Sequence, residues 1–376
     1  MSKKRLDSPA IRKINREEVV SYIRQNSGAT ITKILAALEL SRPTVTNILE
    51  ELENAGLIMK EKDTVNTGGR SAMAYKCVAQ SRLAIGIQLS QKHIRGVVVD
   101  MNGVVLAKAR RRIVFHVNEE YRREIGNVYE ELVNAIEQDE SAITGVGITV
   151  QALTDAEGTK VTYIPIESSE DASYEALDKY VPVRTRLFHD LTALGYNRNL
   201  WVDQNVFYLS MNSSIGGTVL VGNKVYYGND NKAGEIGHIQ LERNGNPCYC
   251  GNHGCFDAYC NTSILREFAD GTLDGFFEKL KEGDKKYVEF WDEYMDYFAA
   301  AVFSIRIIFD SVIMIGGELG KYAEYFMDDL RDRLDKKTFF PGERAAEYLF
   351  VYQDGEYAIA VGAAMYYINH VLDELM

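Results

Sequence analysis

Four of the chain's five cysteines fall between residues 248 and 260, in the stretch GEIGHIQLERNGNPCYCGNHGCFDAYC that spans residues 234–260. Two of the six histidines lie in the same stretch. Thiolate and imidazole are the ligands that Zn(II) prefers, and structural zinc sites use four of them in a tetrahedron. Five cysteines in 376 residues are too few for a disulfide scaffold. The cluster therefore predicts a metal site that anchors a loop of low apolar content, with six candidate ligands: His238, Cys248, Cys250, His253, Cys255 and Cys260.

Charge is distributed unevenly along the chain. Residues 1–80 hold 13 Lys and Arg against 9 Asp and Glu, whereas the rest of the chain holds 29 against 45. A basic head on an acidic body indicates that only the head approaches a polyanion. The sequence contains neither an apolar run of about 18 residues nor a secretory signal. We therefore expect a cytoplasmic protein with no membrane partner.

The head shows the pattern of a winged helix-turn-helix. Apolar spacing predicts a helix over residues 16–25 and a second one that starts at Thr30. Ser41 is a good N-cap for a third helix, which Gly56 ends. This helix buries a stripe of Val45, Ile48, Leu49 and Leu52. The stretches LIMKEK and AMAYKCV that follow predict the two strands of a wing.

The third helix is the candidate recognition element. Its polar face carries Arg42, Thr44, Thr46 and Asn47, which can reach base edges in the major groove. Arg70 in the glycine-flanked wing loop could reach a phosphate or the minor groove. A small helical protein-interaction module is the alternative. The helix pattern, the wing and the positive charge together favour DNA binding, although Glu39 stands where the preceding turn often has glycine.

The body contains two similar arrangements of three β-rich segments. RLAIGIQLS, HIRGVVVDMNG and VVLAKARRRIVF form the first, with a hairpin signal at Asn102-Gly103. NVFYLSMNS, GGTVLVGN and KVYYG form the second, with a hairpin signal at Gly222-Asn223. TGVGITV and VIMIGGE are further apolar strands that end in ligand-facing turns. The repetition predicts a duplicated α/β domain with two lobes and a cleft between them.

This layout is shared by the actin and sugar-kinase (ribonuclease-H-like) superfamily, and the cysteine motif resembles one of its families more closely. GEIGH at residues 234–238, followed by CYCGNHGC at residues 248–255, resembles the signature of the ROK family (repressor, open reading frame, kinase). The resemblance covers essentially the whole chain. It implies a winged helix-turn-helix over residues 1–80, a first lobe over residues 81–191 completed by a C-terminal helix in residues 356–376, and a second lobe with the zinc loop over residues 192–355.

The same resemblance selects the metal ligands. It implies that His238, Cys248, Cys250 and Cys255 hold a structural Zn(II) with no open coordination position, so that this metal should not activate water. It also implies that Glu235 and the zinc-bound His238 hydrogen-bond the hydroxyl groups of a sugar. The metal would then hold one wall of a carbohydrate pocket.

Several positions depart from the pattern of a ROK kinase. Gln88 stands where the family has an Asp that handles the metal–nucleotide, and Ser90-Gln91-Lys92 replace its glycine-rich phosphate turn. Asp190 matches the catalytic base, but its neighbour is His189 in place of Asn. Asp257 replaces a Glu, and Gln151-Ala152 replace a Pro-Gly. We therefore predict no catalysis, with Asp190 a relic base, and an effector-binding set of Asp190, His189, Glu235, His238, Asp257 and Gln151.

The resulting hypothesis is a sugar-responsive transcriptional repressor of carbohydrate-utilisation genes. It would bind palindromic operator DNA as a homodimer or a dimer of dimers, and the effector would be a sugar or sugar derivative held between the lobes. One alternative is a carbohydrate kinase with an appended DNA-binding head. Another is a regulator that a partner protein controls, with a vestigial pocket.

Overall fold

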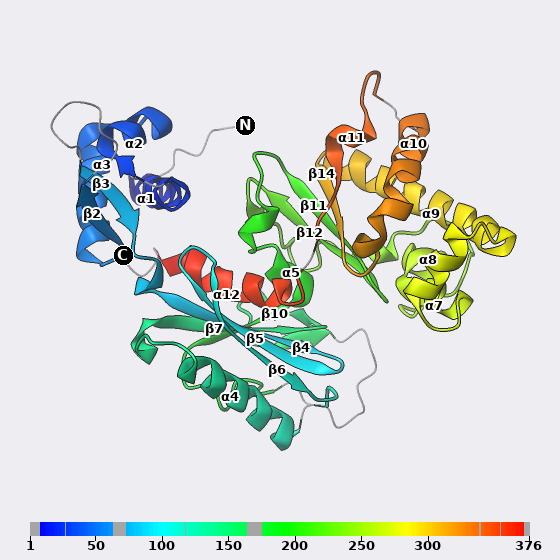
Figure 1. The fold of residues 1–376 in the computed structure, drawn as a ribbon, viewed down its shortest axis with the longest axis horizontal. Coiled ribbons are helices and arrows are strands. Elements are labelled where there is room, and N and C mark those ends of the chain that lie inside the picture. The colour runs from blue at the N-terminus through cyan, green and yellow to red at the C-terminus, as the bar shows by residue number, and fades with distance from the viewer. Residues whose placement is uncertain are drawn as a thin grey trace.

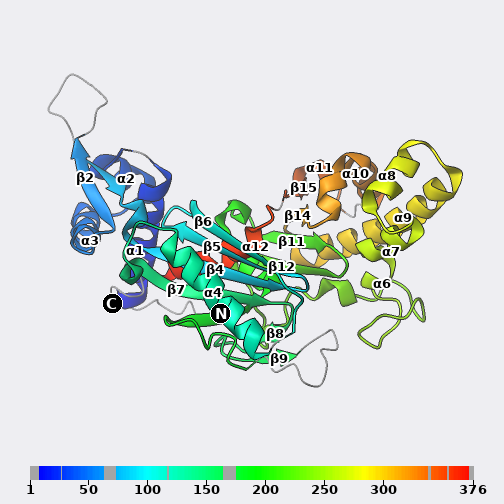
Figure 2. The same cartoon turned by 60° about the horizontal axis from the view of Figure 1, so that its bottom comes forward.

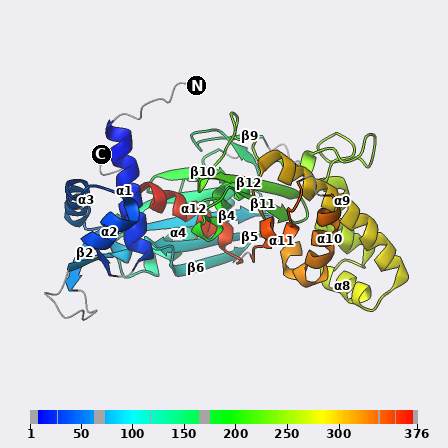
Figure 3. The ribbon, with the colours of Figure 1, turned by 90° about the horizontal axis from the view of Figure 1, so that it is seen from above.

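The computed structural model of the chain describes residues 8–26, 28–62, 73–116, 118–163, 175–337, 340–353 and 355–371. The molecule is elongated, with a small N-terminal head at one end, a first lobe in the middle and a second lobe at the other end (Figures 1 and 3). Within the described ranges, no helix is both long and apolar enough to cross a membrane.

The head is a winged helix-turn-helix. Its helices are α1 (Ser8–Gln25), α2 (Ile31–Leu38) and α3 (Arg42–Asn54), and its strands are β1 (Ala29–Thr30), β2 (Ile58–Lys62) and β3 (Met73–Cys77). The three helices and the two wing strands lie where the sequence predicts them, although α1 begins earlier. The sequence does not reveal β1, which adds a short third strand beside β3. Arg70 and the rest of the wing loop lie outside the described residues.

Local chemistry sets the ends of α3 and of the helix before it. The Ser41 side chain accepts a hydrogen bond from the amide of Thr44, as expected of an N-cap. Glu39 takes the left-handed conformation (φ 53°, ψ 28°) and its amide bonds to the carbonyl of Leu35. That conformation costs a non-glycine residue about 1–2 kcal/mol. The turn between α2 and α3 therefore has the geometry that usually selects glycine.

The first lobe is a five-stranded sheet of order β10-β7-β4-β5-β6. Its strands are β4 (Leu83–Ser90), β5 (His93–Asp100), β6 (Val105–Arg112), β7 (Ile143–Val150) and β10 (Thr185–His189). Helix α4 (Glu119–Asn134) covers one face, and helix α12 (Ala358–His370) covers the other (Figure 2). All residues of β7 are buried, since this strand pairs in parallel on both sides and is covered on both faces.

The second lobe repeats this sheet with the order β13-β12-β11-β14-β15. Its strands are β11 (Val206–Met211), β12 (Ile215–Val221), β13 (Lys224–Val225), β14 (Val312–Gly316) and β15 (Leu349–Val351). In each lobe a central strand pairs antiparallel with the next strand of a meander and parallel with a later strand. The order and the sense of pairing therefore correspond strand by strand, which confirms the predicted duplication.

Further helices complete the second lobe. They are α6 (Asp257–Cys260), α7 (Thr262–Phe268), α8 (Leu273–Lys281), α9 (Lys285–Phe309), η5 (Leu319–Tyr325), α10 (Met327–Lys337) and α11 (Ala345–Tyr348). Short elements elsewhere are η1 (Ala79–Ser81), η2 (Glu140–Ala142), β8 (Leu153–Thr154), β9 (Val161–Tyr163), α5 (Asp190–Leu194), η3 (Arg198–Leu200) and η4 (Ile236–His238).

Helix α12 approaches the first sheet at backbone distance. A Cβ atom added to Gly86 of β4 would lie 1.8 Å from the carbonyl oxygen of Ala360. The far end of α12 also reaches the head, because Val371 and Met101 belong to the same apolar core as Ile23 of α1. Head and first lobe therefore share one continuous core.

Candidate functional site

The four residues selected as metal ligands form one cluster. The ligand atoms of His238, Cys248, Cys250 and Cys255 all lie within 4.8 Å of one another. Nδ1 of His238 is 3.7 Å from Sγ of Cys248, and Sγ of Cys250 is 3.8 Å from Sγ of Cys255. Two sulfur atoms that bind one zinc ion tetrahedrally at about 2.3 Å are about 3.8 Å apart. The cluster therefore has the spacing and the donor set of a tetrahedral metal site.

Glycines and two short bridges shape the loop that carries the cysteines. Backbone bridges pair Gln240 with Cys255 and Pro247 with His253. Gly254 has a φ of 77°, and a Cβ there would lie 1.7 Å from the carbonyl oxygen of Glu242. Only glycine fits, so the motif's second glycine is a requirement of the turn.

The two remaining candidate ligands point elsewhere. The side chain of His253 is exposed. Cys260 is fully buried, and its Sγ lies 3.6 Å from the carbonyl oxygen of Tyr294. Neither belongs to the cluster.

A tyrosine that the sequence did not single out lies against the ligand histidine. The hydroxyl of Tyr249 is 3.3 Å from Nε2 of His238, the ring nitrogen that does not face the cysteines. Its ring meets the imidazole edge to face at 5.2 Å. Burial, followed by the nearby Asp257, raises the pKa of Tyr249 well above its usual value, so the phenol stays protonated. In the sequence, the position of Tyr249 between Cys248 and Cys250 was the one feature that could have indicated this contact.

Glu235 precedes the single 3-10 turn η4, which ends at His238. With three residues per turn, Glu235 and His238 lie on the same side of this turn. Glu235 is exposed to solvent, yet the surrounding protein raises its pKa through desolvation. An exposed but desolvated carboxylate is typical of a concave surface.

Asp257 is 2% exposed, and its carboxylate accepts a hydrogen bond from the backbone amide of Ile215. Burial raises its pKa to about 6. One oxygen of Asp257 is therefore committed to holding the start of β12 beside α6. Together, Glu235, His238, Tyr249 and Asp257 are termed the zinc-side group.

A second set of polar residues surrounds Asp190 in the first lobe. Asp190 is the first residue of α5 and is 6% exposed. Its Oδ2 atom lies 3.5 Å from Nε2 of Gln88 on β4, and the hydroxyl of Thr149 on β7 donates to Oδ1. Burial raises the pKa of Asp190 to about 6, against the opposing effect of these two hydrogen bonds. Both carboxylate oxygens are therefore engaged by neighbouring strands.

His189 and Gln151 flank this set. His189 ends β10, and burial lowers its pKa to about 4, so its imidazole is neutral. Gln151 follows β7 and is exposed. We term Gln88, Thr149, His189 and Asp190 the aspartate group. Within the described ranges, no direct hydrogen bond joins the aspartate group to the zinc-side group.

A cavity of about 10 Å³ lies between the lobes beside His189. It has room for at most one water molecule. Two contacts narrow it: Asn231 of the second lobe donates to the carbonyl oxygen of Thr154 in the first lobe at 3.1 Å, and the hydroxyl of Tyr227 meets that of Tyr196, which follows α5. Sequence patterns did not indicate these residues. A sugar at His189 would require the lobes to separate.

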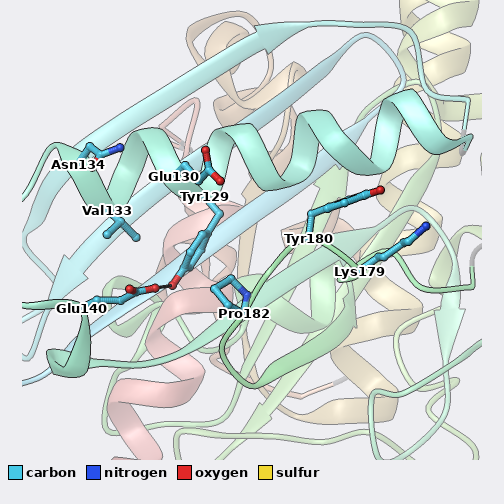
Figure 4. A pocket seen from close by; sticks show the side chains of 8 residues that line it. All are labelled: Tyr129, Glu130, Val133, Asn134, Glu140, Lys179, Tyr180 and Pro182. Atoms are coloured by element: carbon cyan, nitrogen blue, oxygen red, sulfur yellow. Dashed lines mark hydrogen bonds between the residues drawn. The ribbon is translucent and has the colours of Figure 1, made fainter.

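A larger cavity of about 480 Å³ lies on the opposite side of the first lobe, along α4 (Figure 4). Tyr129 points from α4 toward Glu140, to which its hydroxyl donates a hydrogen bond at 2.5 Å. No member of the aspartate group or of the zinc-side group lines this cavity. The lining residues are Tyr129, Glu130, Val133, Asn134, Glu140, Lys179, Tyr180 and Pro182.

The candidate DNA-binding residues lie together at the start of α3. Arg42 and Asn47 are exposed, whereas Thr44 and Thr46 are half-buried. The hydroxyl of Thr44 lies 2.8 Å from that of Ser41, so it also takes part in the N-cap. The predicted buried stripe of α3 is confirmed, since Val45, Ile48, Leu49 and Leu52 are each at most 2% exposed.

Comparison with known proteins identifies the body. Residues 84–369 match the ROK family, and residues 15–67 match the MarR family. The chain belongs to the ROK family. It is 23% identical over 266 residues to the xylose repressor of Bacillus subtilis (strain 168), covering 69% of this chain and 68% of that one. It is 22% identical over 262 residues to the N-acetylglucosamine repressor of Escherichia coli O6:H1 (strain CFT073), covering 68% and 64%.

The fold is also that of a solved ROK regulator. The crystal structure of a ROK family transcriptional regulator, a homologue of the E. coli MLC protein, matches with a TM-score of 0.79 at 20% identity, over 97% of this chain and 99% of that one. A winged head on a two-lobed sugar-kinase-like body is therefore the architecture of this ROK protein.

Two glycines in the strands of the second lobe of this ROK protein are required by close packing. Gly217 lies inside β12, and a Cβ there would lie 2.6 Å from the ring of Phe207. Gly316 ends β14, and a Cβ there would lie 2.4 Å from the hydroxyl of Tyr208.

Proposed function

We propose that this ROK protein is a sugar-responsive transcriptional regulator that represses carbohydrate-utilisation genes. The observation that supports it most is the continuous core between a winged helix-turn-helix and a ROK body, joined through Val371 and Met101. Its similarity to xylose and N-acetylglucosamine repressors agrees with this proposal. The two relatives are named for different sugars, so an experiment with several sugars must identify the effector of this chain.

The head would read operator DNA through α3. Arg42 and Asn47 project from its exposed face, and an Asn side chain can bond an adenine edge in the major groove with two hydrogen bonds. Thr44, Thr46 and Arg70 would add contacts to bases or phosphates. Two copies of the chain would place two heads on a palindromic site.

The effector would bind between the aspartate group and the zinc-side group. A sugar offers hydroxyls that both donate and accept, which suits the Asp190 and Glu235 carboxylates and the neutral His189 imidazole. His238 and Gln151 would complete the site, and Asp257 would hold its backbone. A bound Zn(II) at His238, Cys248, Cys250 and Cys255 would have no open position, so its contribution would be to fix this wall.

Catalysis is not part of the proposal. Gln88 cannot coordinate a metal–nucleotide as a carboxylate does, and its amide is turned toward Asp190. Asp190 bonds to Gln88 and Thr149, although its raised pKa would suit a general base. A coupled ATP assay over a sugar panel should therefore show no turnover. Sugar-dependent ATP consumption would contradict the proposal and favour a kinase.

The first test is selection of fragmented genomic DNA from the source organism with purified, zinc-loaded protein, followed by sequencing. Enrichment of one palindromic site would support the regulator. Asn47→Ala should then weaken binding to that site by about 5- to 150-fold, from the loss of about 1–3 kcal/mol of base contact. Asn54→Ala, an exposed residue at the far end of α3, is the matched control. Absence of any enriched site at low and moderate salt would overturn the proposal.

A further inference from the structure

A short segment connects the aspartate group to the head. It begins with Asp190 at the start of α5, and the 3-10 helix η3 that follows begins at Arg198. Only seven residues therefore lie between Asp190 of the proposed effector site and Arg198. A displacement of Asp190 would therefore reach Arg198 unless these few residues deform.

Helix α12 holds the segment at backbone distance. A Cβ added to Gly362 of α12 would lie 2.2 Å from the carbonyl oxygen of Ala193 in α5. Such contact leaves no side chain to yield between the two helices, so they move together. Figure 1 shows α12 extending from the region of α5 to the side of the first lobe on which the head lies.

Arg198 clamps the segment to the other end of α12. Its Nε and one terminal nitrogen donate to Oδ1 of Asn369 at 2.9 and 2.5 Å. Its guanidinium also lies 5.6 Å from the centre of the Trp201 ring. Asn369 in turn donates to the carbonyl oxygen of Tyr196 at 3.4 Å.

The segment lies where the body meets the head. Arg198 bonds Asn369, which stands two residues before Val371, and Val371 shares an apolar core with Ile23 of α1. Burial lowers the pKa of Arg198 to about 9, and the next cause is the positive charge of Arg24 on α1. Burial likewise lowers the pKa of Arg24, and the carboxylate of Asp100, which opposes this effect, already accepts the amides of its own hairpin turn. Arg198 therefore joins the segment to the end of α12 that packs on the head.

The same helix of the head holds the recognition helix. Arg16 of α1 is 4% exposed and donates to Glu51 of α3 at 2.8 Å, and Arg12 pairs with the other oxygen of Glu51. Helix α1 therefore carries Arg24 at the junction and Arg16 against α3. A shift or rotation of α1 would change the presentation of α3 to DNA.

We propose that Arg198 is the positioning residue that couples effector binding at Asp190 to the DNA-binding head. The coupling runs from α5 through Arg198 and Asn369 to the end of α12, where Val371 shares a core with Ile23 of α1. From Arg16 on α1 it continues to Glu51 on α3. This inference rests on the proposed function. The effector biases the head only to the extent that it binds one position of α5 more tightly than another.

The test is the effect of a sugar on operator affinity in Arg198→Gln. The sugar is the member of a panel of D-xylose, D-glucose and N-acetyl-D-glucosamine that binds the wild-type protein in calorimetry, and the operator is the site selected from genomic DNA. In the wild type we expect the sugar to change operator Kd by about 5–150-fold. In Arg198→Gln we expect less than about a twofold change, while sugar affinity and sugar-free operator affinity each stay within about threefold of wild type.

A purely structural role of Arg198 would not change how α1 responds to sugar. Sugar should alter hydrogen–deuterium exchange of α1 in the wild type and leave it unaltered in Arg198→Gln. Asn369→Ala removes the hydrogen-bond acceptor of Arg198 and keeps the guanidinium, and it should also reduce the effect of sugar on operator Kd. If Arg198→Gln does not fold, this variant tests the proposal in its place. Arg331→Gln, a half-buried arginine of the second lobe that bonds the carbonyl oxygen of Leu349, is the matched control and should retain full coupling.

The outcomes separate the two proposals. Suppose that the wild type binds an operator and responds to sugar, and that Arg198→Gln and Asn369→Ala respond as strongly. This result would overturn the role of Arg198 and leave the sugar-responsive function standing. A wild-type protein whose operator affinity no sugar changes would overturn both the role of Arg198 and the sugar-responsive function. Loss of operator binding by Arg198→Gln without sugar would show a structural role and also overturn the inference.

Discussion

At the scale of single residues, the aspartate group shows how one substitution changes the chemistry of its neighbour. Gln88 is 7% exposed and reaches Asp190 across 102 positions of sequence. A carboxylate at position 88 would repel Asp190, whereas the amide donates to it. The amide of Gln88 therefore stabilises the negative charge of Asp190.

The titration of Asp190 leads to a prediction for stability. Burial raises its pKa to about 6 in the folded protein, above about 3.9 in an unfolded chain. Between these values the folded protein binds a proton that the unfolded chain releases, so stability falls as pH rises from about 4 to about 6. Asp190→Asn has no ionisable carboxyl at this position, so its stability should not fall over this pH range for this reason. Denaturant unfolding should show it about 1–3 kcal/mol more stable than wild type at pH 7.5.

The same comparison near pH 4 is the internal control, since Asp190 is then largely protonated and the two proteins should be about equally stable. A constant difference at both pH values would mean that the effect is one of packing.

The cluster of cysteines leads to a second prediction at this scale. Cys250→Ala should reduce the metal content from about one ion per chain to near zero, as measured by elemental analysis. The melting temperature should fall by roughly 5–10 °C, because each kcal/mol shifts Tm by about 2–4 °C in a domain of this size. His253→Ala, which alters an exposed neighbour outside the cluster, should keep both metal and Tm. Full metal content in Cys250→Ala would contradict the ligand assignment.

At the scale of elements, helix α12 is buried on more than one side. Its buried residues surround the helix axis. The reason is its position, because it packs on β4, β5 and β7 on one side and on α5 on another. Glycine and alanine along α12 allow this close approach.

Gly362 provides the corresponding prediction. In Gly362→Ala the new methyl group would meet the backbone of Ala193 at 2.2 Å, where no side chain can rotate away. We expect a loss of about 1–3 kcal/mol or more in unfolding free energy. Gly355→Ala, which places its methyl group in open space just before the same helix, should change stability by less than about 0.5 kcal/mol. Equal stability of the two variants would mean that α12 is not held as described.

At the scale of the whole molecule, the position of the head determines how DNA can be bound. One head presents one α3, so a palindromic operator needs two chains. We expect light scattering to give at least twice the chain mass of 42.4 kDa. Removing one half-site should weaken binding by about 100-fold or more, because the second contact loses its high effective concentration.

The spacing of the half-sites tests the same geometry. An insertion of five base pairs should weaken binding as strongly as removal of a half-site, because it turns one half-site to the opposite side of the duplex. A ten-base-pair insertion should restore part of the affinity. Equal binding to single and paired half-sites would contradict a dimeric reader.

Much of this protein is determined by its sequence alone, wherever the cause is local. Ser41 caps α3, Gly56 ends it, and apolar β-rich segments with hairpin signals between them produce both three-stranded meanders. The four metal ligands could be selected by resemblance because their spacing lies within one loop. These features depend on a few neighbouring residues, so no other part of the chain was needed to predict them.

Only the tertiary structure decided the contacts between distant segments. Thr149 and Gln88 hold Asp190 from two other strands, Tyr249 turns onto His238, and Arg198 bonds Asn369 at the end of α12. Each of these contacts depends on how sheets and helices pack, and packing is a property of surfaces that many residues form together. Periodicity and spacing predict which face of an element is buried, but they do not specify which side chain lies opposite it.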